Sequence, residues 1–521
     1  MLKPNYDVEP TAVDRQVFDA LIAKDHYLRR LKQVIDFEAM RPLMADAYSA
    51  TMGRGAEDPV RMLKLSLLQA HYDLSDRDVI ARAAVDVSFR FLLDLSLESP
   101  LPDPSSLVYF RRRLGPERFR AIFDHVVAQA RTHGLVGDRL RLKDATHLLA
   151  SVAIPTTLQL VAQARDHLLR AAEPFAADVV EAHRAEAKAI RTSTRDLKDV
   201  QRLAARVAHL ERIIAWAEVL VEQVGAWRAE APEHVRPHLE QGLREAVALA
   251  RQIVADREEG AKDRVRSVVD PDVRTIKHGG FHDGYLLDLC VDADSELITS
   301  VDVLAANADE AANAKELIES EEEAHGNNVE AISIDGIGYR GDVLEALSGP
   351  GGPEVEVFVP VHEWSGRTPG TFGPEAFRLS DDRQQVTCPG GQTTRQHTRS
   401  WHGTGERFVF RLTQCRDCPL RRHCQSERAR TGRVVTKSDY ERQYGEARRR
   451  AESAAYRQVR REHARVERKL ADVIRNHGGR RVRYRGLKRV KVQYVVASLA
   501  ANAKRIVNLL TPKLAPLCTP S

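Results

Sequence analysis

The sequence has no apolar run long enough to cross a membrane. In a chain of 521 residues, the longest apolar stretch near the end is Tyr494 to Ala503. That is about half of the roughly 20 residues that a transmembrane helix needs. The N-terminus, MLKPNYDVEP, also has no basic start followed by an apolar segment. We therefore expect a cytoplasmic protein that has no membrane partner.

Acidic residues are absent from the C-terminal end. Residues 473–521 contain eleven Lys or Arg and no Asp or Glu, in a chain whose formal net charge is only +5. Seven of these positive charges fall between Arg480 and Lys491, with Tyr484 among them. A basic block without acidic partners usually contacts phosphate or lies disordered, and a solvated helix face is less favoured. We expect this segment to contact nucleic acid.

Cysteine is scarce, and its placement is uneven. Of six cysteines, four lie between residues 388 and 424: Cys388, Cys415, Cys418 and Cys424. A Cys-x2-Cys pair with two flanking cysteines favours a structural zinc ion, because four thiolates complete a tetrahedral site. Reduced cysteines or a redox pair would also fit a cytoplasmic chain. A nearby histidine could replace one ligand, the candidates being His397, His402 and His423.

What the sequence does contain is typical of a soluble globular protein of two to four domains, with 43% hydrophobic and 29% charged residues. The first 130 residues predict a helical bundle, because apolar residues recur at helical spacing in four segments: 27–48, 59–72, 75–91 and 105–133. Arg111, Arg112 and Arg113 lie together in the last segment. Such a cluster either forms a solvated face or grips DNA.

A second helical region follows a first strand. Residues 155–265 are rich in Ala, Glu and Arg, and their apolar residues form a heptad-like seam: Leu203, Val207, Leu210, Ile214, Ala217 and Val221. We expect an antiparallel helical hairpin or a small bundle with a structural or dimer-forming role.

Strand patterns flank this helical region. Alternation from Arg139 onward places Asp144 on a strand, and a hairpin follows at 285–291 and 297–303. A helix is expected at 309–325, where Glu321 to Glu323 read as a solvated face. Another strand is expected at 355–361. These elements predict a mixed α/β sheet that is interrupted by the helical insertion.

The stretch AISIDGIGYRGDVLEAL, from Ala331 to Leu347, ends a short strand in Asp335 and turns through Gly336 and Gly338 into a helix. The carboxyl edge of a strand is where open α/β sheets place ligands, and glycine permits the tight turn. Two further acids are candidates for the same site. Asp144 could instead cap a turn. Glu467, beside the apolar stripe of a long helix expected at 440–477, could instead pair with a neighbouring arginine.

The order Asp144, Asp335, Glu467 resembles the DDE transposases of bacterial insertion sequences, in the branch with an N-terminal helical domain and a ribonuclease-H-like core. The resemblance spans nearly the whole chain. It lies in HYLRRLKQVIDF, EDPVRMLKLSLLQAHYDLSDRDV, PDPSSLVYFRRRL, DATHLLA, DPDVRTIKHGGFHDGYLLDLCVDADSELI, RLTQCRDCPLRRHC and RVERKLADVIRNHGGRRVRYRGLKRV. One departure is that Gly338-Tyr339 follows Asp335 one position later than the family's usual Gly-Tyr pair.

The resemblance implies five regions. These are a helical DNA-binding domain at 1–135, a ribonuclease-H-like core at 136–154 and 266–365, and a helical insertion at 155–265. A cysteine-rich, zinc-binding insertion at 366–438 follows, and a catalytic helix with a basic segment at 439–511 completes the core.

The resemblance also implies a magnesium-dependent enzyme. Asp144, Asp335 and Glu467 would hold two Mg2+ ions, or Mn2+, for DNA strand cleavage and transfer. The partners would be double-stranded DNA, namely terminal inverted repeats and target DNA, and a second copy of the chain, at the nucleoid in the cytoplasm. The residues expected to contact DNA are Arg111, Arg112, Arg113, Arg475, Arg480, Arg481, Arg483, Arg485 and Lys488. There are two alternatives. The protein could be a catalytically inactive, DNA-binding repressor, or a ribonuclease-H-like nuclease that cuts DNA without strand transfer.

Overall fold

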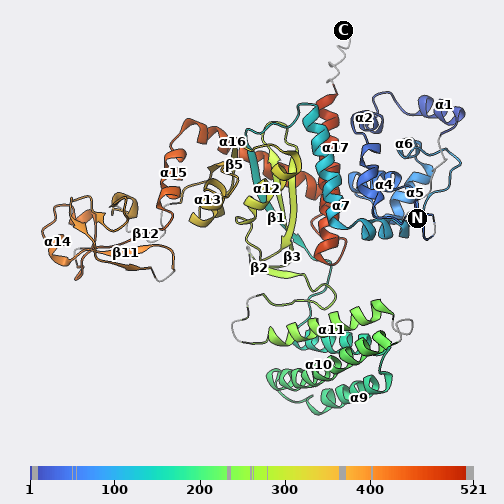
Figure 1. The fold of residues 1–521 in the computed structure, drawn as a ribbon, viewed down its shortest axis with the longest axis horizontal. Helices are drawn as coiled ribbons and strands as arrows, with labels where there is room; N and C mark the ends of the chain where they lie inside the picture. Colours follow the sequence, from blue (N-terminus) through green and yellow to red (C-terminus); the bar gives the residue numbers. More distant parts are fainter. Residues whose placement is uncertain are drawn as a thin grey trace, which may run out of the picture.

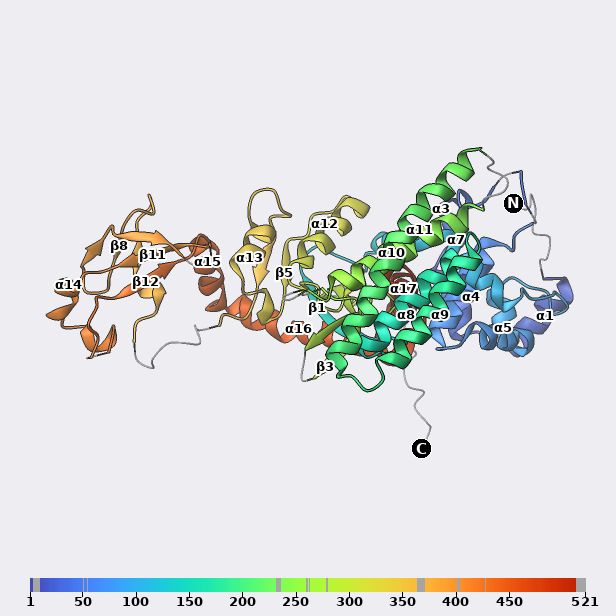
Figure 2. The same ribbon diagram turned by 90° about the horizontal axis from the view of Figure 1, so that it is seen from below.

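The computed structural model describes residues 1–2, 10–49, 51–53, 55–230, 236–258, 261, 263–277, 280–362, 371–400, 403–426 and 428–511. The molecule is elongated, as Figure 2 shows, with a helical bundle at one end and a small β-rich region at the other. A mixed sheet lies between them, and a second helical bundle projects from it (Figure 1). None of the helices in the described ranges is long and apolar enough to span a bilayer.

The central sheet has six strands in the order β2-β3-β1-β5-β6, with β4 also paired to β3. Its strands are β1 (Arg141–Leu149), β2 (Arg274–Lys277), β3 (Phe281–Asp292), β4 (Ile298–Ala305), β5 (Ala331–Ser333) and β6 (Glu356–Phe358). β3 is antiparallel to β1, β2 and β4, whereas β5 runs parallel to β1 and β6. The predicted hairpin and mixed sheet are therefore present. The largely apolar run of β3 is buried over most of its length, as expected for a central strand.

The N-terminal helices form the predicted bundle: α1 (Ala12–Leu21), α2 (Tyr27–Val34), α3 (Arg41–Ala45), α4 (Pro59–His71), α5 (Asp76–Val85), α6 (Val87–Leu92) and α7 (Pro104–Thr132). Side-chain caps set several starts. Asp58 accepts a bond from Val60 N at 3.0 Å, with Pro59 in the first turn. Asp103 caps α7 in the same way, so this helix begins one residue before the predicted Ser105.

The C-terminal helix α17 (Leu487–Leu510) joins this bundle to the sheet. It packs against α2, α4 and α7 on one side and β4 on the other, and lies beside α7 in Figure 1. One hydrophobic core consequently runs from Leu28 in the bundle, through Leu142 of β1, to Val507.

The insertion after β1 is a four-helix bundle of α8 (Thr157–Ala172), α9 (Ala177–Ser193), α10 (Asp199–Glu230) and α11 (Pro237–Ala255). It has a separate core. The heptad-like seam of α10 packs into that core, which confirms the prediction of a small bundle.

Two helices follow the hairpin: α12 (Asn313–His325) after β4 and α13 (Gly341–Ser348) after β5. The cysteine-rich region holds two three-stranded sheets, formed by β7 (Arg378–Leu379), β8 (Val386–Thr387), β9 (Thr393–Thr394), β10 (His397–Arg399), β11 (Glu406–Val409) and β12 (Val434–Lys437). It also contains α14 (Leu412–Arg416).

The long helix expected at 440–477 is divided, so that prediction was wrong in its continuity. α15 (Glu441–Ala451) ends before Ser453, whose hydroxyl caps α16 (Ala454–Asp472) by accepting a bond from Tyr456 N at 3.0 Å. A π-helical turn, η5 (Val473–Gly478), then leads to the basic segment. Serine at a helix N-terminus satisfies an otherwise unpaired backbone donor.

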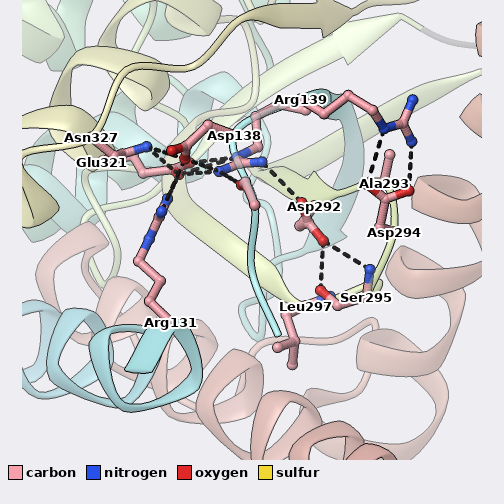
Figure 3. A network of polar contacts seen from close by, with 12 residues as sticks. Arg131, Asp138, Arg139, Asp292, Ala293, Asp294, Ser295, Leu297, Glu321 and Asn327 are labelled. Atoms are coloured by element: carbon pink, nitrogen blue, oxygen red, sulfur yellow. Dashed lines mark hydrogen bonds and ion pairs between the residues drawn. The ribbon is translucent and has the colours of Figure 1, made fainter. Parts of the chain in front are cut away.

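The prediction that Glu321 belongs to a solvated face was also wrong. Its side chain is fully buried and accepts bonds from Arg141 Nη2 and Arg131 Nη2, both at 2.6 Å. Arg141 also contacts Asp292 Oδ1 at 3.0 Å, and Arg131 contacts Asp138 Oδ1 at 2.9 Å, so two arginines and three acids form one network at the start of β1 (Figure 3). Glu323, two residues on, is exposed as expected. The apolar pattern around α12 gives no sign of this, because the partners of Glu321 lie 180 and 190 residues away.

Candidate active site

Asp144 lies near the middle of β1, on the face of the sheet that α16 covers. Alternation along the strand sends Leu142 into the main core, while Lys143 points the other way and contacts Asp288 Oδ1 at 3.1 Å. Asp144 itself is half-buried, and its Oδ1 accepts a bond from Ala145 N at 2.8 Å. The strand predicted from sequence thus carries the acid as expected.

Asp335 follows the last residues of β5. Its side chain caps a single 3-10 turn, η2 (Gly336–Gly338), by accepting a bond from Ile337 N at 3.2 Å. This turn takes up the extra residue before Gly338-Tyr339. β5 pairs in parallel with β1, Leu142 being opposite Ser333. Asp335 follows two residues after Ser333, beyond the end of β5, and lies close enough to Asp144 for its charge to act on that carboxyl group.

The electrostatics agree with this proximity. Burial raises the pKa of Asp144 to about 6, against the effect of the Ala145 N–H, and the negative charge of Asp335 raises it further. Glu310 acts in the same direction and Lys143 opposes it. A carboxyl group in this setting stays ionised more readily when a cation lies nearby.

Two residues that sequence reasoning missed fix α16 over the end of β5. Arg460 Nη1 donates to Ile334 O at 2.9 Å and to Ser333 Oγ at 3.2 Å. His463 Nδ1 lies 3.0 Å from the same hydroxyl. Burial lowers the pKa of His463 to about 3, with the charges of Arg460 and Lys143 adding to the effect, so the imidazole is neutral. The sequence does indicate that His463 is buried, because it lies at helical spacing with Val459, Val466 and Leu470, which are buried residues of α16.

Glu467 is an exposed residue of α16. It lies seven residues after Arg460, so both project from the same side of the helix, with Glu467 about two turns further along it. The opposite side faces Arg139, which contacts Glu462 at 2.8 Å. Arg468, one of the expected partners of Glu467, lies instead 4.0 Å from Glu296. The structure places Asp144 and Asp335 near each other, whereas no contact among the described residues joins Glu467 to either of them.

The four cysteines predicted to bind zinc line a single pocket with Phe377 and Phe410. Burial raises the pKa of the Cys424 thiol, and the other three thiols add to the effect, opposed by Arg433. His402 lies outside the described residues. Among the described residues, one group of three or more metal-binding side chains has its ligand atoms within 4.8 Å of one another: His183, Glu186 and His209. Neither the four cysteines nor the three acids meet that distance.

The basic residues predicted to contact DNA divide into two sets. Several bind their own chain. Arg111 contacts Asp76 at 2.5 Å and lies over the Tyr484 ring, Arg113 lies over the Tyr48 ring, and the remaining members are Arg480, Arg481 and Arg483. The side chains of the others make no hydrogen bond or ion pair among the described residues: Arg112, Arg475, Arg485 and Lys488. All nine except Arg111 are exposed.

The basic segment also extends the central sheet. Leu149 N donates to Arg480 O and Val482 N donates to Leu149 O, both at 2.9 Å, so residues 480–482 run beside the end of β1. The segment is thereby tied to the strand that carries Asp144.

Two family models match the chain. A transposase domain (DUF772) covers residues 16–113, which form most of the N-terminal bundle. A transposase DDE domain covers residues 387–507, which include the four cysteines, Glu467 and most of α17. Asp144 and Asp335 lie between the two matched ranges. No curated protein and no solved structure matches the chain.

The two domains, in this order around a mixed α/β sheet, define a transposase. The two matches support a DDE transposase of an insertion sequence.

Proposed function

We propose that this transposase binds the ends of its insertion sequence and catalyses metal-dependent strand cleavage and strand transfer, with Asp144, Asp335 and Glu467 as its catalytic acids. The observation that carries the proposal is the proximity of two acids that are 191 positions apart in the sequence, one on β1 and one just after the neighbouring parallel strand β5. The mixed sheet, with β3 and β4 on one side of β1 and β5 and β6 on the other, supports a ribonuclease-H-like core.

The donor set fits a hard divalent cation. Mg2+ and Mn2+ prefer carboxylate oxygens and retain waters, so a few acids at the edge of a sheet suffice. The raised pKa of Asp144 marks a place where negative charge is only partly compensated. When bound there, the metal would activate the attacking oxygen and stabilise the leaving one at the scissile phosphate.

Side chains of the protein itself fix the positions of the candidate catalytic acids. Asp144 and Asp335 hold two carboxylates on one rigid face. Arg460 and His463 hold α16 against Ser333, and Glu467 lies on the same side of α16 as Arg460. Preorganisation of this kind matters because small displacements of a catalytic group are costly in rate.

DNA would approach from the side of the basic segment. Residues 480–482 are paired with the end of β1, five residues beyond Asp144, and Arg485 and Lys488 are exposed shortly after them. Contacts to the phosphate backbone position a duplex without reading its sequence. Because two element ends must be joined, a homodimer on DNA is the working unit that we propose.

The test is an assay with the element's terminal inverted repeats, a target plasmid and Mg2+, which scores cleavage and strand transfer separately. We expect Asp144→Asn, Asp335→Asn and Glu467→Gln each to abolish both reactions while binding to the repeats remains. Glu462→Gln is the matched control, because Glu462 lies on the other side of α16 beside Arg139. It should retain activity.

The alternatives predict other results. A repressor would bind the repeats without any cleavage by the wild type. A nuclease without joining activity would cut but give no transfer product. If cleavage persists in Asp335→Asn, the assignment of the site is refuted.

We also propose that the four cysteines hold a structural zinc ion, since their thiols line one pocket beside an aromatic core. Four thiolates leave no open coordination position, which suits a structural role. Metal analysis of the purified protein should find zinc that is lost in Cys418→Ser and retained in a Glu467→Gln variant. Absence of zinc from the wild type would refute this proposal.

A further inference from the structure

The helical insertion carries a second cluster of metal-binding side chains, remote in sequence from the three acids and the cysteines. His183 and Glu186 lie one turn apart on α9, and His209 lies on α10. Their ligand atoms all lie within 4.8 Å of one another. The α9–α10 pair would therefore be bridged by any ion that they share.

The distances already approach those of a coordination shell. His209 Nε2 lies 3.2 Å from Glu186 Oε2, and His183 Nδ1 lies 3.7 Å from the same oxygen. In a tetrahedral zinc site with Zn–N bonds of 2.0–2.1 Å, two donor atoms are about 3.3 Å apart. Only small side-chain movements would complete the shell.

The surroundings of His209 point to a ligand. The residue is only 1% exposed, and its Nε2 is buried and makes no hydrogen bond within the described residues. Buried polar atoms are nearly always satisfied, and this nitrogen faces the Glu186 carboxylate at 3.2 Å without a hydrogen bond, as a metal ligand would.

The carboxylate is held in place from its other side. Arg212 Nη2 binds Glu186 Oε1, which leaves Oε2 directed at the two histidines. Partners that orient a ligand in this way raise the affinity of metal sites. His183 also packs against the Trp216 ring, with centroids 5.2 Å apart.

We propose that His183, Glu186 and His209 form a site for a divalent transition metal, zinc by preference, which clamps α9 to α10 in the insertion. Two imidazoles and one carboxylate suit Zn2+ and Co2+ better than Mg2+. Three protein ligands leave one position for water. The site is separate from the catalytic acids, and its role is to stiffen the insertion.

Trp216 provides a local readout. Full-length protein in excess Mg2+ would be titrated with Co2+, a paramagnetic stand-in for Zn2+, while tryptophan emission is followed. We expect saturable quenching at one equivalent, which is lost in Trp216→Phe and reversed when Zn2+ is added. His183→Gln and Glu186→Gln should each weaken binding at least tenfold. Neither residue is fully buried, so these variants should fold.

His238→Gln is the control, because His238 is an exposed histidine of α11 in the same bundle. It should bind Co2+ as the wild type does. Equal quenching in wild type and His183→Gln, or no saturable quenching in the wild type, would overturn the proposal. Strand cleavage by His183→Gln, assayed without transition metals, should match the wild type, so failure of this site and failure of the proposed catalytic site give different results.

Discussion

At the scale of single residues, the central sheet depends on charges that have been taken out of water. Arg141 is fully buried between Glu321 and Asp292. Burial alone would raise the pKa of Glu321, but the Arg141 guanidinium outweighs it and lowers that pKa. A buried ion pair of this kind contributes little net stability, yet removal of one partner leaves the other charge uncompensated.

We therefore expect Glu321→Gln to lower the free energy of unfolding by about 3 kcal/mol or more. The matched control is Glu323→Gln on the exposed side of α12, which should change it by less than about 0.5 kcal/mol. Urea unfolding followed by circular dichroism measures both. Equal effects of the two variants would show that the network carries no such penalty.

His71 makes the free energy of unfolding depend on pH. Its ring is stacked on Tyr27 at 4.4 Å, and burial lowers its pKa to about 4, with His477 and Lys504 adding to the effect. The unfolded state, with a histidine pKa of about 6.5, binds more protons between pH 6.5 and 4. Stability should accordingly fall as pH drops through this window, by up to about 3 kcal/mol.

The measurement is the urea midpoint at pH 7.5 and at pH 5. The wild-type midpoint should be lower at pH 5 than at pH 7.5. We expect a smaller difference in His71→Phe, which keeps a ring against Tyr27. His133→Gln, at an exposed position, should retain all of it. A decrease in His71→Phe as large as that of the wild type would contradict the assignment.

Asp144 and Asp335 could be found from the sequence because each ends or occupies a short strand whose neighbours alternate in polarity. Glu321 could not, since local pattern gives no sign of partners 180 residues away. His463 lies between these cases. Its place in the apolar stripe of α16 predicts burial, but only the fold brings Ser333 to it.

At the scale of elements, the position of α16 decides whether the candidate acids meet. Arg460 donates to the last carbonyl before Asp335 and to the Ser333 hydroxyl, so it anchors the helix at the point where β5 ends. The division between α15 and α16 also had a signal in the sequence. Ser453 is a favourable cap, but continuous helical periodicity on both sides of it concealed the break.

We expect Arg460→Gln to reduce strand cleavage by roughly ten- to a hundredfold, because a shift of about 1 Å in a catalytic group has such effects. Binding to the terminal repeats should change little. Arg461→Gln, at the exposed neighbouring position, is the control and should cleave normally. If Arg460→Gln cleaves at the wild-type rate, the anchor does not position Glu467.

At the scale of the whole molecule, one core joins the N-terminal bundle, the sheet and α17, while the insertion and the cysteine-rich region lie outside it (Figure 1). The elongated shape in Figure 2 spreads these parts along one axis. The sequence predicted each part, since helical and strand periods are local. It could not predict that α17, at the end of the chain, closes the core of the first domain.

Within the whole molecule, the basic side chains of the segment after η5 have two different roles. All three side chains are exposed, but Arg481 Nη1 donates to Ala150 O at 2.7 Å, beside the end of β1, whereas Arg485 and Lys488 make no such bond among the described residues. If the latter pair contacts phosphate, Arg485→Ala and Lys488→Ala should each weaken binding to any duplex and reduce the slope of log K against log salt by about 0.9. Arg481→Ala should instead lower the urea midpoint and leave that slope unchanged. Fluorescence anisotropy over a range of salt concentrations measures the slopes, and a reduced slope in Arg481→Ala alone would reverse the two roles.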